Sequence, residues 1–132
     1  MKPSVLDSYA LLAFLFAEKG HEKVVDLFDK AAHADLPILI AAPNWAEVRY
    51  MVDRKASTMR WTEVRQRLLG LPLEVVPVDR LLAEAAGEIK AVARMSLADC
   101  FAAALASQRR ADLYTGDPEF RAVEKNVRVV WL

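Results

Sequence analysis

Three long segments of this chain are almost free of charge, and each contains a single carboxylate. Segment 3–17 holds only Asp7, segment 36–48 holds only Glu47, and segment 95–108 holds only Asp99. Since 27% of the chain is charged, a window of this length would ordinarily hold about four charges. The segments therefore have the composition of buried elements, in which a carboxylate is costly unless it is paired, protonated or bound to a metal.

Short apolar runs alternate with helical patterns along the chain. This order predicts an α/β fold, with a mainly parallel sheet of four to five strands flanked by helices, in one domain of residues 1–132. We expect strands at Ser4–Leu6, Ile38–Ala41, Leu73–Val76, Leu113–Thr115 and Arg128–Leu132. We expect helices at Ser8–Glu18, with Gly20 as its C-cap, and at His21–Ala34, Pro43–Lys55, Ser57–Leu69, Arg80–Ala93 and Leu97–Gln108.

The acids occupy similar places in this pattern. Asp7, Glu47 and Asp117 each follow a predicted strand, and Asp99 lies in the first turn of a predicted helix. In a parallel sheet the carboxyl ends of the strands share one edge, where ligands bind. The pattern predicts that Asp7, Glu47 and Asp117 meet at that edge, whereas the place of Asp99 is inferred.

Helix capping is the alternative interpretation of the same acids. Asp7 and Asp117 precede helical segments, and Glu47 and Asp99 stand three residues after residues that favour the N-cap position. Capping explains each acid separately. It does not explain why their surroundings are apolar, so the four together favour a shared acidic site.

Four clustered carboxylates repel one another, and a divalent cation removes that repulsion. Mg²⁺ and Mn²⁺ prefer such oxygen ligands, and they suit phosphodiester hydrolysis because they activate water and stabilise a leaving oxygen. Ser8 and Thr115 stand beside Asp7 and Asp117 and could orient the carboxylates or a water. His21 and His33 belong to no visible pair, and we expect both on the surface.

The bulk composition excludes several classes of protein. The net charge is zero, so a nucleic-acid partner would need a local patch, such as the basic segment 49–67 with Tyr50 and Trp61, or bound metal ions. The only cysteine, Cys100, excludes a disulfide framework and a cysteine-based zinc site within one chain. The apolar stretch Tyr9–Ala17 is too short to span a bilayer. We expect a soluble, cytoplasmic protein without membrane contact.

Four motifs occur in an order and spacing that resemble a known family. They are VLDSYALLAFL (Val5–Leu15), NWAEVRYMV (Asn44–Val52), SLADCFAAALA (Ser96–Ala106) and TGDPEF (Thr115–Phe120). Each motif is weak alone, but together they resemble bacterial VapC-type toxins of the PIN-domain family. The resemblance covers nearly the whole chain.

The resemblance implies a PIN-like fold in which Asp7, Glu47, Asp99 and Asp117 bind Mg²⁺ or Mn²⁺, with Asp7 and Asp99 as the foremost direct ligands. It implies a toxin of a type II toxin-antitoxin system, an endoribonuclease that cleaves tRNA or rRNA to stop translation and growth. It also implies a homodimer and a cognate VapB-type antitoxin. Tyr9 departs from the family pattern, since many relatives carry a small polar residue there.

Two other functions remain open. A receiver-like phosphoacceptor also gathers acids around Mg²⁺, but it needs paired acids near the first strand and a lysine after a late strand. Here Asp7 has no acidic neighbour, and the late strand leads into Gly116 and Asp117. The second alternative is a catalytically silent PIN-like module that only binds a partner or RNA.

Overall fold

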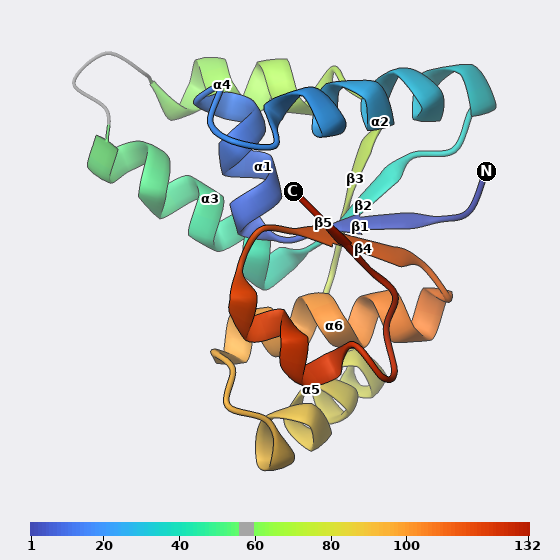
Figure 1. The fold of residues 1–132 in the computed structure, drawn as a ribbon. Coiled ribbons are helices and arrows are strands. Elements are labelled where there is room, and N and C mark those ends of the chain that lie inside the picture. The colour runs from blue at the N-terminus through green and yellow to red at the C-terminus, as the bar shows by residue number, and fades with distance from the viewer. Residues whose placement is uncertain (56–59) are drawn as a thin grey trace.

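The computed structural model describes residues 1–55 and 60–132, and a parallel sheet lies at the centre of the fold (Figure 1). Within the described residues the sheet has five strands, in the order β3-β2-β1-β4-β5, and the strand pairings are parallel. The strands are β1 (Ser4–Leu6), β2 (Ile38–Ala41), β3 (Leu73–Val76), β4 (Asp112–Thr115) and β5 (Val129–Trp131). The predicted α/β fold with a parallel sheet is confirmed.

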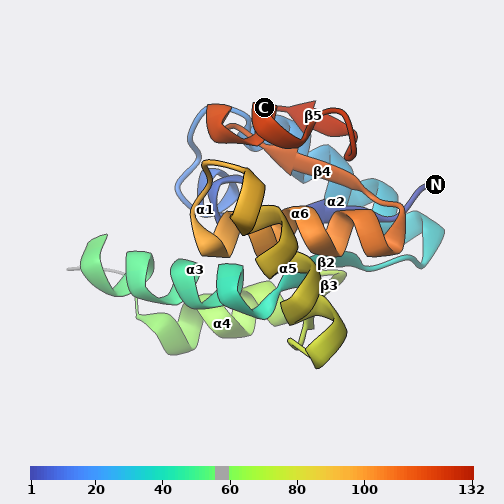
Figure 2. The same cartoon turned by 90° about the horizontal axis from the view of Figure 1, so that it is seen from below.

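Helices cover both faces of the sheet, as Figures 1 and 2 show from two directions. One layer contains α1 (Ser8–Leu15), α2 (His21–Ala34), α3 (Ala42–Lys55) and α4 (Trp61–Leu69). The opposite layer contains α5 (Arg80–Val92), α6 (Leu97–Arg109) and the 3₁₀ helix η1 (Pro118–Val123). None of the helices in the described parts of the chain combines the length and the apolar character that crossing a bilayer requires.

The central strands β1 and β2 are buried throughout because each face of the sheet carries a helical layer. Neighbouring strand residues alternate between two cores: Val5 and Leu39 pack with α5 and α6, while Leu6 and Ile40 pack with α1 to α4. These four side chains are at most 5% exposed. Continuous apolar strands of this kind are typical of parallel sheets. Helices thus pack on both faces of the sheet, and the candidate site lies at its carboxyl edge.

The end of the first helix differs from its prediction. Helix α1 ends at Leu15, and the N–H of Glu18 donates to the carbonyl of Ala13 at 2.9 Å in a helix-ending turn. The left-handed residue of this turn is Ala17, with φ 51°. Gly20, expected as the C-cap of this helix, instead precedes α2 with φ 91°. The prediction was wrong because alanine occupies a position where glycine is usual.

The other boundaries agree with the sequence within one residue at the ends that can be compared. The expected start of the fourth helix, Ser57, lies outside the described residues, and α4 is described from Trp61. The chain thus enters and leaves the sheet nearly where the apolar runs predict.

Candidate functional site

Three neighbouring strands bring three of the predicted acids to one edge of the sheet. Strand β1 lies between β2 and β4. Asp7 follows β1 directly, Glu47 lies in the second turn of α3, which begins directly after β2, and Asp117 follows β4 after Gly116. The chain order reverses between β1 and β4, and such a switch point is where open α/β sheets bind ligands.

Asp99 reaches the same edge through a helix instead of a strand. The side chain of Asn44 in α3 is fully buried, and its Nδ2 donates to the carbonyl of Ala98 at 3.0 Å. Ser96 caps α6 by accepting from the N–H of Asp99 at 3.2 Å. These contacts fix the first turn of α6 against α3, so Asp99 lies 7% exposed beside the other acids.

Asp7 is the most enclosed of the four, with 1% of its surface exposed. Its Oδ1 accepts from the N–H of Ala10 at 2.8 Å, and its Oδ2 accepts from the hydroxyl of Thr115. The same hydroxyl oxygen accepts from the N–H of Asp117 at 3.0 Å. Burial raises the pKa of Asp7 to about 7, against these hydrogen bonds, and the charges of Asp99 and Asp117 add to the rise.

The carboxylates perturb one another electrostatically. Burial raises the pKa of Asp99 to about 7, and the charges of Asp117, Glu47 and Glu119 raise it further. Burial also raises the pKa of Glu47, although the polar groups of nearby residues, the buried Ser8 among them, lower it. Mutual repulsion of this kind requires the acids to be close in space.

Sequence reasoning missed one acid of the cluster, Glu119. Single oxygens of Asp99, Asp117 and Glu119 lie within 4.8 Å of one another. The N–H of Glu119 also donates to Asp117 Oδ1 at 2.9 Å in the first turn of η1. Glu119 is exposed and stands in an ordinary polar stretch, so its only signal was that it lies two residues after Asp117. Asp7 and Glu47 lie outside this tightest group.

The cluster has an excess of acceptors that a cation would satisfy. Glu47 Oε1 and Asn44 Oδ1 are the two buried side-chain atoms without a hydrogen-bond partner in the part of the chain that the structure describes. The ion pairs found within residues 1–55 and 60–132 do not include the five acids of the cluster. Carboxylate and amide oxygens are ligands that Mg²⁺ and Mn²⁺ favour. The donor set therefore fits a divalent cation.

Capping and clustering turn out to be compatible. Asp7 and Asp117 are N-caps of α1 and η1, and each uses one carboxylate oxygen for that purpose. A carboxylate has about four acceptor positions, so a cap leaves capacity for a cation. Glu47, in contrast, lies within α3 and caps no helix end.

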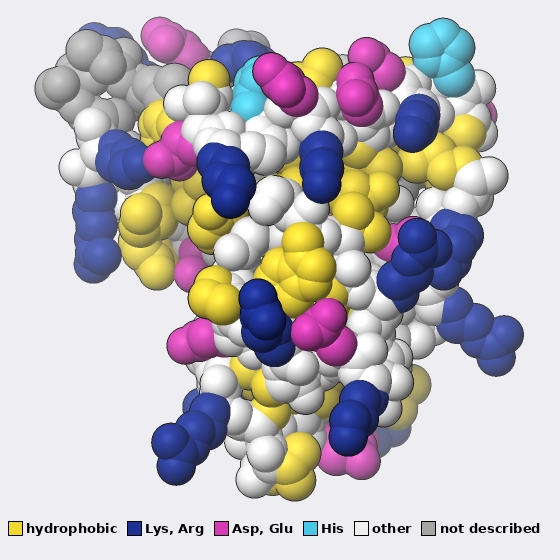
Figure 3. Space-filling model, in the orientation of Figure 1, with side chains coloured by type: hydrophobic (Ala, Val, Ile, Leu, Met, Phe, Trp, Pro, Cys, Tyr) yellow, Lys and Arg dark blue, Asp and Glu magenta, His cyan; other side chains and the backbone are white. Residues whose placement is uncertain are grey.

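Most of the basic residues of segment 49–67 that the structure describes lie against aromatic rings of the same chain. Trp61 packs edge-on against Trp45, with ring centroids 5.3 Å apart, and the guanidinium of Arg49 lies over Trp61 while pairing with Asp53 at 2.7 Å. Figure 3 shows Lys and Arg side chains spread over the face it presents, with acids between some of them and several cations adjacent to one another at the right-hand side. Trp61 is thus a packing residue.

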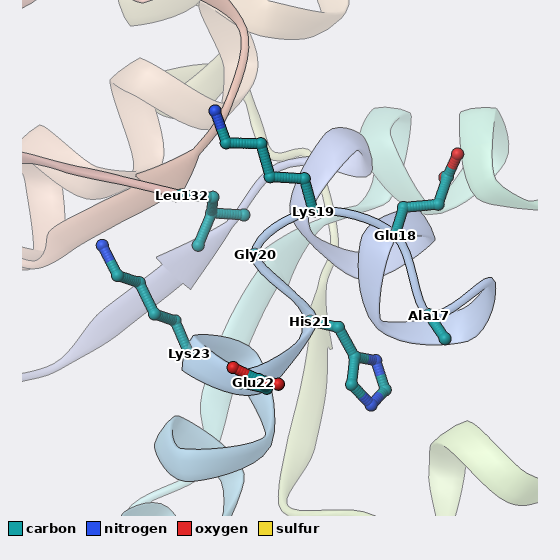
Figure 4. Close-up of a pocket in the computed structure, with 8 residues that line it drawn as sticks. All are labelled: Ala17, Glu18, Lys19, Gly20, His21, Glu22, Lys23 and Leu132. Atoms are coloured by element: carbon teal, nitrogen blue, oxygen red, sulfur yellow. The ribbon is translucent and has the colours of Figure 1, made fainter.

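A cavity of about 830 Å³ lies between the α1–α2 loop and the last residue, Leu132 (Figure 4). Its lining mixes the cations Lys19 and Lys23 with the anions Glu18 and Glu22, and it contains none of the clustered acids. His21 lines it, half buried, with its ring stacked on Phe14 and its Nδ1 3.0 Å from the Phe14 carbonyl oxygen. His21 thus lies at the surface, as expected, but it is half buried because its ring packs on Phe14.

Comparison with known proteins agrees with this geometry. A family model described as the PIN domain matches residues 4–126. The DNA-bound VapBC structure from Salmonella typhimurium is similar with a TM-score of 0.79 at 19% identity, covering 98% of both chains. VapBC2 from Rickettsia felis, bound to a promoter DNA fragment, gives 0.72 at 15% identity and the same coverage, and FitAcB from Neisseria gonorrhoeae gives 0.65 at 22% identity, covering 96% and 95%. At these identities the likeness is one of fold. No curated protein matches the sequence itself.

Proposed function

Because that family model spans nearly the whole chain, the protein belongs to the PIN domain family, and on this premise we propose that it is a metal-dependent endoribonuclease. PIN domains are generally nucleases. The family membership argues against the receiver-like alternative.

The observation that carries the proposal is the group of carboxylates at the carboxyl edge of the sheet. Oxygens of Asp99, Asp117 and Glu119 lie within 4.8 Å of one another, and Asp7 and Glu47 are close enough for the charge of Asp117 to raise the pKa of each. Five acids without a cationic partner among the described residues, and two buried oxygens without a hydrogen bond, support a bound cation.

Each residue has a distinct role in this proposal. Asp7 and Asp99 are direct ligands of Mg²⁺ or Mn²⁺, and Glu47 and Asp117 complete the site. Thr115 orients Asp7 through its hydroxyl, and Ser8 supports Glu47. A divalent cation held here supplies the positive charge that activates a water and stabilises the leaving oxygen during phosphodiester hydrolysis.

Cleavage of RNA by the purified protein tests the enzymatic part. We expect cleavage with Mn²⁺ or Mg²⁺, none with EDTA, and a rate at least about 100-fold lower in Asp99→Asn. Asp112→Asn is the matched control, because Asp112 is an equally buried aspartate at the opposite end of β4. Equal cleavage by Asp99→Asn and the wild type would reject the assignment.

Calorimetric titration with Mn²⁺ separates the nuclease from a silent binding module. The nuclease proposal expects a site that disappears in Asp7→Asn, whereas a module that only binds partners would show no such site. Metal binding without any RNA cleavage would reject the nuclease, whereas the absence of any such metal site would favour the module.

We further propose that the nuclease is the toxin of a type II toxin-antitoxin pair, with tRNA or rRNA as its target, and that it acts as a cytoplasmic homodimer. The VapBC names of its structural neighbours support a VapB-type antitoxin as the partner. Expression should arrest growth, and co-expression of the product of a short neighbouring gene should restore it. Growth unaffected by the wild-type protein would contradict the toxin role.

A further inference from the structure

A groove of about 340 Å³ runs between α1 and α3, the two helices that leave the acidic edge side by side (Figures 1 and 2). Tyr9 lines the groove in the first turn of α1, two residues after Asp7. The middle is lined by Leu12, Ala13 and Met51. The groove therefore begins next to the carboxylates and continues over an apolar floor.

Cations lie at the far end of the same groove. Lys19 follows the end of α1, and Lys55 is the last residue of α3. The ammonium of Lys55 lies 4.5 Å from the ring centroid of Phe16 and only 3.8 Å from a Glu18 oxygen, with both partners about half exposed. So loose a pair in solvent is weak, and two cations against one anion leave this end positive.

Tyr9 is held in place by the turn that carries Asp117. A Cβ built on Gly116 would stand 2.2 Å from Tyr9 Cε1, so the tyrosine ring lies directly on the glycine backbone. Tyr9 is nevertheless 41% exposed, which leaves part of the ring open to solvent. A fixed, half-open aromatic ring beside a metal-binding edge is a surface on which a base can stack.

The three parts of the groove match the parts of one ligand. A cation at the acids and the lysines at the far end would each attract a phosphate, while Tyr9 and the apolar floor suit the flat faces of bases. Helix α1 has eight residues and is about 12 Å long, so the groove spans a short run of nucleotides. A duplex does not present its base faces in this way, whereas a single strand does.

We propose that this groove binds single-stranded RNA next to the cleaved bond, with one base stacked on Tyr9 and phosphates near Lys19 and Lys55. The inference rests on the proposed nuclease function and adds where its substrate strand lies. It gives Tyr9, the departure from the family pattern, a role in substrate binding.

Binding of a fluorescein-labelled octauridine RNA, followed by anisotropy with Asp99→Asn in every protein to prevent cleavage, tests the proposal. We expect Tyr9→Ala to raise the Kd at least about fivefold and Tyr9→Phe, which keeps the ring, to change it little. Gly116→Ala should reproduce the loss by displacing the ring, and the Tyr9→Ala, Gly116→Ala double variant should lose no more than Tyr9→Ala alone. An unchanged Kd in Tyr9→Ala would overturn the proposal.

The lysines are tested by the dependence of the Kd on salt. Replacing both Lys19 and Lys55 by glutamine should lower the slope of log K against log salt by about 1.4, since each phosphate contact to a single strand contributes about 0.7. The matched control replaces Lys30 and Lys125, exposed lysines outside the groove, and should leave the slope unchanged. An equal effect of both pairs would overturn the phosphate contacts.

Two further measurements separate this inference from the nuclease function. If the protein with an intact Asp99 cleaves RNA, Tyr9→Ala and the double-lysine variant should raise KM while Mn²⁺ affinity stays as in the wild type. If both variants cleave RNA with an unchanged KM, the proposed RNA-binding role of the groove is rejected and the nuclease function is retained. If the wild type shows neither metal-dependent cleavage nor RNA binding, both proposals are rejected. Variants that weaken binding of a protein partner but not of RNA would assign the groove to that partner instead.

Discussion

The two ends of the parallel sheet differ in whether their buried aspartates have ion-pair partners. At the amino end, Asp112 of β4 is 8% exposed and meets Lys2 Nζ at 2.9 Å and Arg128 Nη1 at 3.7 Å. At the carboxyl end, Asp7 and Asp99 are buried to a similar degree and form none of the ion pairs found among the described residues.

This difference separates an acid whose charge is compensated within the described chain from acids whose charge is not. The amino end neutralises its carboxylate with side chains of the same chain, so it needs nothing from solution. The carboxyl end keeps several repelling carboxylates together, which lowers stability unless protons or a cation are taken up. Burial alone did not separate the two classes, whereas the presence or absence of a cationic partner does.

The largest expected effect that tests this contrast is stabilisation by a metal. Mn²⁺ at about 100 times its Kd should raise the free energy of unfolding by about 2.7 kcal/mol, because the folded cluster binds it and the unfolded chain does not. Scanning calorimetry should show this gain in the wild type and in Asp112→Asn, and lose it in Asp99→Asn. A gain in stability of the same size in Asp99→Asn would contradict the proposed difference between the two ends of the sheet.

The next effect is the pH dependence of the metal-free protein. Burial raises the pKa of Asp7 from 3.8 to about 7, so between these values the folded state holds more protons than the unfolded state. The contribution of Asp7 to stability is therefore greatest at low pH and falls as the pH rises towards 7, with about 1.4 kcal/mol at stake for each pKa unit. We expect urea titrations to show this fall.

Asp7→Asn checks the origin of that fall. The variant cannot ionise, so its stability should depend less on pH, and at pH 8 it should exceed the wild type by roughly 1 to 3 kcal/mol. A metal-free wild type that becomes more stable between pH 5 and 8, or a less stable Asp7→Asn at pH 8, would refute the account of the carboxyl end.

The smallest expected effect concerns the amino end. Asp112→Asn removes the pairs with Lys2 and Arg128, whose side chains are 56% and 69% exposed, so it should cost less than about 1 kcal/mol. Its sign is opposite to that of Asp7→Asn, and the loss should shrink in 1 M salt because exposed pairs are screened. A salt-independent loss of several kcal/mol would contradict the comparison.

The strands and most helix ends could be read from the sequence because local patterns determine them. The segments Ile38–Ala41 and Leu73–Val76 became strands with those boundaries; the first is buried throughout, and the second is buried at both of its ends. The end of α1 was mistaken because Ala17, and not a glycine, adopts the left-handed conformation there. Such an exception depends on the turn geometry and leaves no mark in the composition.

Only part of the candidate site could be predicted from the sequence. Lone carboxylates in apolar segments indicated Asp7, Glu47 and Asp99, because burial makes an isolated charge conspicuous. Glu119 gave no such signal, since its own position is exposed and only the fold brings it to Asp99. The contact of Tyr9 with Gly116 was equally invisible, because it joins residues far apart in the chain.

The hydrogen bond from Thr115 to Asp7 makes the acidic cluster depend on two distant parts of the chain. Its partners are 108 positions apart, and the same hydroxyl oxygen accepts from the N–H of Asp117. Asp7 therefore gains this partner only when β4 has paired with β1. A folding intermediate without that strand pairing would lack both Thr115 and Asp117 beside Asp7, so the complete cluster would form only late in folding.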